Sequence, residues 1–274
     1  ILLRLLSGIF TLMPLRCALF IARFFGRLGY YLDSRHKRAA YKNLRVAFAS
    51  SREPGELRKI LKRCFINLCQ SFAEILRVSR IDKEYLNRFV KIEGRNYLDG
   101  SFKRGKGVIL LASHFGSWEL AMSACAVLGY PFSVIARTQK STLLDTLLNN
   151  YRRSKGYKII SAEKGVKEIV GNLKAGRVLG LVADHGGGRE GRMVDFFSRP
   201  ASTPMGAVRL ALQFNSSLIM VHTMRYRNQY HRIVLSPPLE LVADIDENLR
   251  RINRYIESYV IDAAYSSYRS RYII

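Results

Sequence analysis

The sequence has few acidic residues. Only 21 aspartates and glutamates stand against 45 lysines and arginines in 274 residues, which gives a formal net charge of +24. Such an excess does not specify a fold, but it favours polyanionic partners: nucleic acid, an anionic membrane surface or a phosphorylated substrate. With 48% hydrophobic and 24% charged residues, the composition is otherwise that of a globular protein and argues against disorder.

Cysteine is also scarce, and its spacing argues against two kinds of site. The chain has 4 cysteines, Cys17, Cys64, Cys69 and Cys125. They form no Cys-x-x-Cys pair, and no nearby histidine completes a zinc-binding set. We expect them to be small, buried, reduced side chains, and we predict no metal centre.

Long hydrophobic runs are missing as well. Residues 1–32 are rich in leucine, isoleucine, phenylalanine and tyrosine, but Arg4, Arg16, Arg23 and Arg27 interrupt them. The longest uncharged run, 5–15, is about half of the ~20 residues that a spanning helix needs. Arginines among bulky apolar residues favour a helix that lies in the membrane interface. A single span stays the alternative.

The rest of the chain predicts an α/β fold. Helical spacing of apolar residues covers 34–48 and 51–78, with Pro54 in the first turn of the second helix. From about Phe89, short apolar runs alternate with helical segments, which indicates a central mixed sheet flanked by helices. The predicted strands are 107–112, 132–136, 157–160, 178–183, 218–223 and 231–235. The predicted helices are 118–128, 143–154, 166–175, 205–214 and 246–264.

Two domains follow from these patterns. The first is a membrane-associated helical segment, 1–32. The second, 33–274, has a helical start to about residue 88, an α/β core over 89–245 and a C-terminal helix.

The chemistry is concentrated in one turn. His114 and Gly116 follow the first predicted strand of the core, and Ser117 is placed to cap the next helix. Ligands bind beyond the carboxyl ends of strands in open α/β sheets, which is where His114 would lie. Glu119, in the first helical turn, can reach back to one imidazole nitrogen. That hydrogen bond would fix the tautomer and stabilise the imidazolium that forms when the other nitrogen takes a proton.

The spacing alone is a weak signal, because a histidine followed five positions later by an acid arises by chance in roughly a third of such chains. A second match, His185 and Glu190, flanks a glycine-rich loop that is poorly suited to holding a pair rigidly. That loop, 184–192, is either a substrate loop or a mobile turn.

Several ordered segments resemble one protein family. Residues 113–119, Ser-His-Phe-Gly-Ser-Trp-Glu, are similar to the HFGNWE block of bacterial lipid A biosynthesis acyltransferases, the late lauroyl and myristoyl transferases of the lysophospholipid-acyltransferase-like superfamily. Further segments that resemble family blocks are 38–48, 65–74, 181–184 and 196–203. Two positions depart from the family pattern: Ser117 stands where asparagine is usual, and His185 where glutamine is usual.

The resemblance implies an enzyme that transfers a fatty acyl chain from acyl carrier protein or acyl-CoA to a hydroxyl of a lipid A precursor. It implies His114 as general base and Glu119 as its orienting partner, with no cofactor or metal. The developing oxyanion needs donors, either backbone amides at the helix start or two arginines. The substrate-binding residues expected on this basis are Arg137, Arg152, Asp184, Gly116, Ser117 and Trp118.

The implied location is the inner (cytoplasmic) membrane. We expect a peripheral, monotopic or single-pass protein whose active site faces the cytoplasm and whose partners are the acyl donor, a glycolipid acceptor and an anionic membrane surface.

Other readings remain. The acceptor could be a phosphatidylinositol mannoside, a lysophospholipid or glycerol phosphate. Enzymes acting on the last two use His-x4-Asp, so Glu119 and Trp118 favour the lipid A type. A nucleic-acid-binding module is the remote alternative. The basic residues spread along the whole chain without a recognition motif, so we expect no nucleic acid partner.

Overall fold

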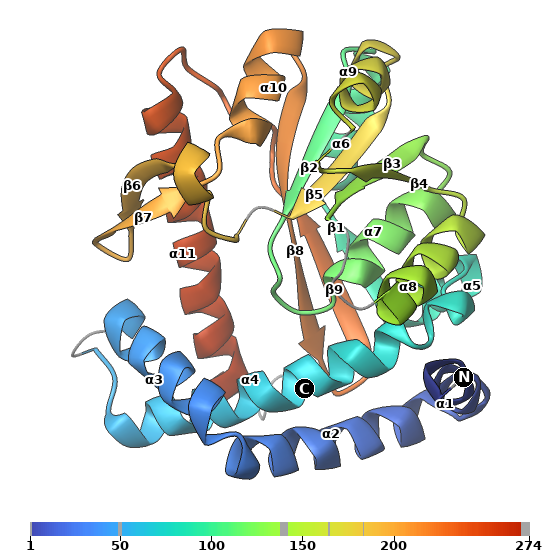
Figure 1. Ribbon diagram of the computed structural model, residues 1–274, viewed down its shortest axis with the longest axis vertical. Helices are drawn as coiled ribbons and strands as arrows, with labels where there is room; N and C mark the ends of the chain where they lie inside the picture. The colour runs from blue at the N-terminus through green and yellow to red at the C-terminus, as the bar shows by residue number, and fades with distance from the viewer. Residues whose placement is uncertain (1, 49–50, 138–141, 164, 183, 270–274) are drawn as a thin grey trace.

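The computed structural model describes residues 2–48, 51–137, 142–163, 165–182 and 184–269 (Figure 1). Within these ranges the centre is a seven-stranded sheet in the order β1-β9-β8-β2-β5-β3-β4. Its strands are β1 (Val90–Glu93), β2 (Val108–Ala112), β3 (Phe132–Ala136), β4 (Lys158–Ser161), β5 (Val178–Val182), β8 (Ser217–Tyr226) and β9 (Tyr230–Leu235). Strands β8 and β9 are antiparallel, and the other neighbours are parallel. The predicted mixed central sheet is confirmed.

Strand β2 lies in the middle of the sheet, and its five residues are all buried. Alternate side chains of a strand point to opposite faces, and Val108 and Leu110 pack into one core cluster while Ile109 and Leu111 pack into another. The first cluster lies under α5 (Lys83–Phe89), α6 (Arg95–Lys103) and α7 (Trp118–Val127). The second lies under α9 (Val166–Lys174), α10 (Gly206–Phe214) and α11 (Ile245–Arg269). Helices therefore cover both faces, as predicted.

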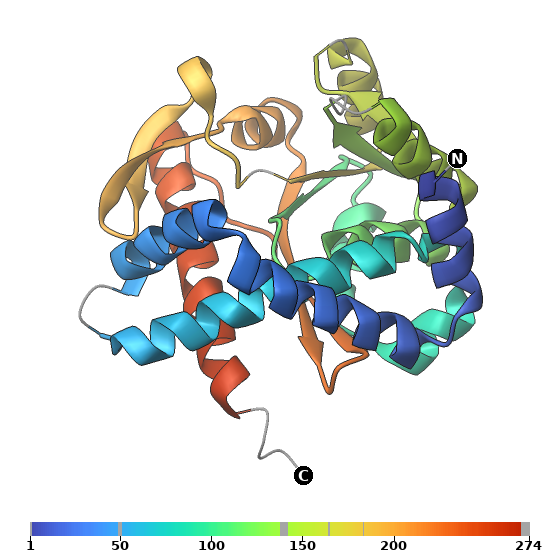
Figure 2. The same ribbon diagram turned by 60° about the horizontal axis from the view of Figure 1, so that its bottom comes forward.

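The chain begins with helices α1 (Leu2–Leu12), α2 (Leu15–Leu32), α3 (Ser34–Phe48) and α4 (Pro54–Ile75). Pro14 separates α1 from α2. Figure 2 shows α2 crossing α4, against which it packs. Their backbones approach closely at Gly26, where a Cβ would lie 2.6 Å from Ile66 Cα, so only glycine fits there. Among the described residues, no helix is both long and apolar enough to cross a membrane.

The bounds of most elements agree with the sequence patterns, and those of α3 and β3 agree at both ends. Ala183, the predicted end of the fourth strand, lies outside the described residues. Several elements were not anticipated: η1 (Val78–Arg80), α5, β1, α6 and η2 (Gly188–Glu190). A hairpin of β6 (Arg192–Phe196) and β7 (Arg199–Thr203) was also missed, and it packs against α11.

The expectation for cysteine was wrong at two positions. All four cysteines are free, but only Cys125 is buried, in the cluster under α7. Cys17 and Cys64 are exposed on α2 and α4, because these helices have little of the chain packed over their outer faces.

Candidate active site

The loop after β2 holds His114 in a fixed backbone shape. Gly116 has a left-handed φ of +63°, and a Cβ there would lie 2.2 Å from the Thr223 carbonyl oxygen. Two hydroxyl groups form hydrogen bonds to the backbone of the loop. Thr223 Oγ1 donates to the Phe115 carbonyl at 3.1 Å, and Ser71 Oγ donates to the Gly116 carbonyl at 3.0 Å. Neighbouring strand β8 and helix α4 therefore position the turn from both sides.

Asp184 holds the His114 ring. It follows β5, the strand beside β2, and one of its oxygens, Oδ1, lies 2.7 Å from His114 Nδ1. Its other oxygen, Oδ2, accepts a hydrogen bond from the His114 backbone N–H at 2.7 Å. Burial alone would raise the pKa of Asp184, but the hydrogen bonds from the His114 ring and backbone lower it below its ordinary value. A carboxylate in this position fixes the Nδ1–H tautomer and leaves Nε2 as the basic nitrogen.

The predicted hydrogen bond between Glu119 and His114 is not found among the described residues. The Glu119 carboxylate is buried and accepts two bonds from Arg152, Nε to Oε1 at 2.8 Å and Nη2 to Oε2 at 2.9 Å. The Tyr157 hydroxyl donates to Oε1 at 2.8 Å. The reason is the direction of the side chain. Glu119 is on the inward face of α7, toward α8 (Thr142–Ser154) and β4, where a buried carboxylate needs partners.

Arg152 is neither an exposed charge nor aimed at the turn. Its guanidinium binds the Glu119 carboxylate in the bidentate geometry that arginine favours. Burial lowers the pKa of Arg152, but the hydrogen bonds and charge of Glu119 more than offset this and raise the pKa above its ordinary value. Arg137, the other arginine predicted for the site, directly follows β3 and is exposed.

Two aromatic rings flank His114. The ring of Trp118, the first residue of α7, lies edge-on to the imidazole with centroids 5.1 Å apart, and the His185 ring lies 4.4 Å away. Ser117 takes the N-cap position as predicted, but its side chain makes no capping hydrogen bond. The first N–H groups of a helix have no partner within it, so the start of α7 offers amide donors beside the turn.

Three side chains at the site are also close enough together to bind a metal ion. His114, Asp184 and His185 each offer a ligand atom, and these atoms lie within 4.8 Å of one another. Two imidazoles and a carboxylate suit zinc. The hydrogen bond between His114 and Asp184 explains why these two are close without invoking an ion.

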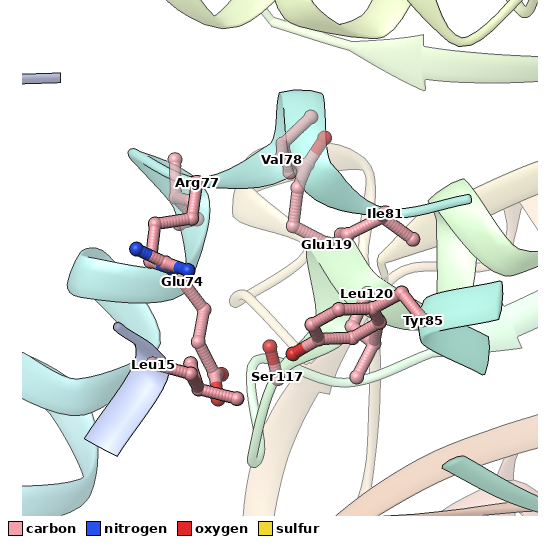
Figure 3. Close-up of a pocket in the computed structure, with 10 residues that line it drawn as sticks. Leu15, Glu74, Arg77, Val78, Ile81, Tyr85, Ser117, Glu119 and Leu120 are labelled. Atoms are coloured by element: carbon pink, nitrogen blue, oxygen red, sulfur yellow. The ribbon is translucent and has the colours of Figure 1, made fainter. Parts of the chain in front are cut away.

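A small cavity of about 10 Å³ lies behind the turn (Figure 3), lined by residues of α4, η1 and the start of α7. A cavity of this size holds roughly one water molecule, so it is not an acyl-chain pocket. Its lining includes Ser117, Glu119 and a second buried carboxylate, Glu74.

Glu74 belongs to a buried charge cluster that sequence reasoning missed. Its carboxylate pairs with Arg225 and accepts from His231 Nε2 at 2.7 Å. Burial alone would raise the pKa of Glu74, but the charges of Arg225 and His231 lower it far below its ordinary value. Arg225 also reaches Ser71 Oγ at 3.5 Å, so the cluster supports the residue that holds the Gly116 carbonyl. The available sequence signal for this cluster was Glu74 itself, an acidic residue on the apolar face of α4.

Comparison with known families gives a match over nearly the whole chain. A family model described as bacterial lipid A biosynthesis acyltransferase matches residues 3–268.

Three curated proteins illustrate the similarity. A phosphatidylinositol mannoside acyltransferase of Mycobacterium tuberculosis is 28% identical over 155 residues, 54% of this chain and 49% of that protein, so the match spans about half of that relative. A lipid A biosynthesis acyltransferase of Haemophilus influenzae is 23% identical over 266 residues, 93% of this chain and 82% of that protein. A lipid A biosynthesis palmitoleoyltransferase of Escherichia coli is 21% identical over 257 residues, 91% of this chain and 81% of that protein.

Proposed function

The chain belongs to the bacterial lipid A biosynthesis acyltransferase family, and from this premise we propose that it transfers a fatty acyl chain from an acyl thioester to a hydroxyl of a lipid A precursor. The donor is acyl carrier protein or acyl-CoA. The observation that carries the proposal is a pair of hydrogen bonds. The Asp184 carboxylate accepts from both the Nδ1 and the backbone N–H of His114, at the carboxyl end of a central parallel strand.

His114 acts as the general base in this proposal. Its Nε2 takes the proton of the acceptor hydroxyl while the oxygen attacks the thioester carbonyl. Asp184 stabilises the imidazolium that results, because its carboxylate already accepts the Nδ1–H. The tetrahedral oxyanion then collapses, the carbon–sulfur bond breaks, and the imidazolium returns the proton to the leaving thiolate. Amide donors at the start of α7 are the candidates for the oxyanion site.

Glu119 has a positioning role in this scheme rather than the orienting role that the sequence suggested. Arg152 and Tyr157 hold it, and it in turn fixes the first turn of α7. That turn carries Trp118, whose ring packs on His114. The Glu119 cluster thus acts on His114 through the helix.

The helical segment 1–32, of which 2–32 are described, is the proposed membrane contact. Large apolar side chains are exposed along α1 and α2 and on the adjoining surface of α4, a concentration that is unusual on a soluble surface. They are Leu5, Ile9, Leu12, Phe20, Phe24, Phe25, Leu28, Tyr31, Leu32, Leu68 and Phe72. Arginines between apolar residues suit a helix in the interface of an anionic bilayer. We place this surface on the cytoplasmic side of the inner membrane.

A phosphatidylinositol mannoside is the second candidate acceptor, because a mycobacterial enzyme named for that lipid matches about half of this chain. The two acceptors share sugar hydroxyls on an anionic lipid, and the His114–Asp184 chemistry is the same for both.

A single-turnover assay tests the proposal. Radiolabelled acyl carrier protein and acyl-CoA are each offered with a tetra-acylated, Kdo-bearing lipid A precursor and, separately, with a phosphatidylinositol mannoside. We expect transfer to the lipid A precursor from at least one donor. Transfer to the mannoside alone would move the assignment to the second acceptor, and folded protein inactive with every pair would overturn the proposed reaction.

A further inference from the structure

A second pocket lies away from the His114 turn, between α2 and the turn that joins β8 to β9. Its volume is about 390 Å³, which falls in the range of small-molecule sites. The lining residues are Arg16, Leu19, Phe20, Arg23, Arg227, Asn228, Gln229 and Tyr230. Of its lining residues, Phe20 also belongs to the proposed membrane contact, and none has a role in the proposed acyl transfer.

The pocket is strongly basic. Three guanidinium groups line it, from Arg16, Arg23 and Arg227, and the described lining contains no carboxylate. On a helix, positions 16 and 23 are two turns apart and therefore share one face. A concave surface with several positive charges and no lining acid attracts anions.

Neutral amides hold two of these arginines in place. Arg16 Nε donates to Gln229 Oε1 at 3.2 Å, and Arg23 Nη1 donates to Asn228 Oδ1 at 2.9 Å. An amide oxygen orients a guanidinium without cancelling its charge, and each guanidinium has five N–H donors, so donors remain for a ligand. Gln229 is itself 8% exposed, so its side chain is set by packing.

The turn that supplies the other wall has an uncommon backbone. Arg227 and Asn228 both have left-handed φ angles, 45° and 67°. Asparagine tolerates this region, but for arginine it costs about 1 kcal/mol or more. Two consecutive left-handed residues are typical of a tight hairpin turn, and the stacked rings of Tyr226 and Tyr230, with centroids 5.8 Å apart, close its base. Strain of this kind is kept where the surrounding structure needs the geometry.

The pocket opens onto the apolar surface of α2. Phe20 lines it and is also 71% exposed. Phe24, one turn further along α2, is 58% exposed. A ligand with its charge in the pocket would therefore have apolar side chains beside it, which suits an amphiphile better than a free ion.

We propose that this pocket binds the phosphate headgroup of an acidic phospholipid, with the acyl chains of that lipid beside Phe20 and Phe24. Arginine forks match phosphate oxygens, and the aromatic rings suit the interface where such a headgroup lies. The binding would fix the orientation of α2 on the bilayer. The inference rests on the proposed membrane contact but not on acyl transfer.

Vesicle binding separates this inference from the proposed membrane contact. The full chain is mixed with phosphatidylcholine vesicles and with vesicles that also contain phosphatidylglycerol, and the bound fraction is measured by sedimentation. We expect the wild type to prefer the acidic vesicles, and the double variant Arg16→Gln/Arg23→Gln to lose that preference by at least about tenfold more than a control with the same charge change. The control is Arg27→Gln/Arg35→Gln, two exposed residues outside the pocket lining.

If the two double variants lose the preference for acidic vesicles equally, the proposed headgroup site is wrong, and the preference comes from the total positive charge of the surface. Failure of the wild type to bind any vesicle would instead count against the membrane contact. Thermal unfolding checks that the Arg16/Arg23 variant is folded, and Arg227→Gln, on the exposed turn, is the second variant.

A soluble probe identifies the ligand. Monomeric short-chain phosphatidylglycerol should bind with one site per chain in calorimetry, and short-chain phosphatidylcholine and inorganic phosphate should not displace it at equal concentration. If inorganic phosphate displaces it, the pocket is a simple anion site and the lipid assignment is wrong.

Discussion

Asp184 makes two contacts with His114, one to the ring at Nδ1 and one to the backbone N–H, both at 2.7 Å. The two contacts fix the position of both the imidazole ring and the loop backbone. The carboxylate therefore determines where the imidazole lies and which of its nitrogens is basic. A substitution that keeps the shape of Asp184 but removes its charge tests both effects.

Asp184→Asn should therefore reduce single-turnover acyl transfer by about 100-fold or more, because an amide cannot accept both hydrogen bonds and stabilise the imidazolium. His114→Ala should lose at least as much. The matched control is Glu190→Gln, an exposed carboxylate of the same loop, which should transfer within about twofold of the wild type. Wild-type rates in Asp184→Asn would remove Asp184 from the mechanism.

Glu119→Gln should act mainly on stability. It leaves the Arg152 guanidinium buried without its charged partner, and breaking a buried pair costs about 3 kcal/mol, measured as the free energy of unfolding in urea. The control is Glu168→Gln, whose ion pair with Lys158 is about half exposed, where the expected loss is under about 1 kcal/mol.

The pH profile of residual transfer separates the two carboxylates. Asp184→Asn should change its shape, since it alters the base directly, and Glu119→Gln should lower activity without changing the shape. The reverse result would return the orienting role to Glu119.

The fold was largely predictable because its core elements are strongly periodic. Strand β3 and helix α3 have clear apolar patterns, and their bounds agree with the sequence analysis. Strand β1 was missed because it is short and only half-buried. The β6–β7 hairpin was missed because its left-handed positions hold Phe197 and Ser198, and not the glycine, asparagine or aspartate that usually mark a tight hairpin turn.

Sequence patterns and the family resemblance named the residues of the candidate site, but not which of the distant residues contact one another. His114 and Gly116 share one turn, so a single segment identified them. The partners come from elsewhere: Asp184 is 70 positions from His114, and Arg152 is 33 from Glu119. The first pairing depends on β2 and β5 being neighbours in the sheet, and the second on how α8 lies beside α7, and one sequence gives neither.

A pH effect on stability is expected from His222. Burial, with a smaller contribution from the charge of Arg232, lowers its pKa to about 4, and the Tyr259 ring packs against it at 3.6 Å between centroids. The unfolded chain binds a proton near the ordinary histidine pKa of about 6.5, and the folded chain does so only near 4, so stability falls as the pH drops through this window. The stabilising contribution is fully present above about pH 6.5.

Urea unfolding at about pH 7.5 and about pH 5.5 should therefore differ by roughly 1 kcal/mol more in the wild type than in His222→Gln. At these values the buried carboxylates, whose pKa values are lowered, stay ionised in both states and contribute little. An equal difference in the two proteins would mean that His222 does not titrate as its burial implies.

Metal ions should inhibit rather than support the reaction. The proposed mechanism has no step that uses a metal, so a chelator should leave the transfer rate unchanged. Added Zn²⁺ should inhibit, because His114, Asp184 and His185 present donors close together, and zinc bound there would break the contact between Asp184 and His114 Nδ1 that keeps Nε2 basic. His185→Gln, which removes one donor, should weaken the inhibition by about tenfold. Activity lost on chelation and restored by zinc would contradict the mechanism.

The exposed phenylalanines of α2 should matter most when the acceptor is in a bilayer. Phe24 and Phe25 are 58% and 56% exposed, and burying even part of such a ring in the acyl layer contributes about 1 kcal/mol or more. Phe24→Gln/Phe25→Gln changes no charge, so it leaves the electrostatic attraction to the membrane in place. Transfer to acceptor in vesicles should fall at least about tenfold further than transfer to acceptor dissolved in detergent. The control pair is Val166→Gln/Met193→Gln, each 64% exposed in the wild type and outside the N-terminal helices, and it should affect the two assays equally. If the phenylalanine pair also lowers both rates equally, the apolar surface of α2 serves some purpose other than membrane contact.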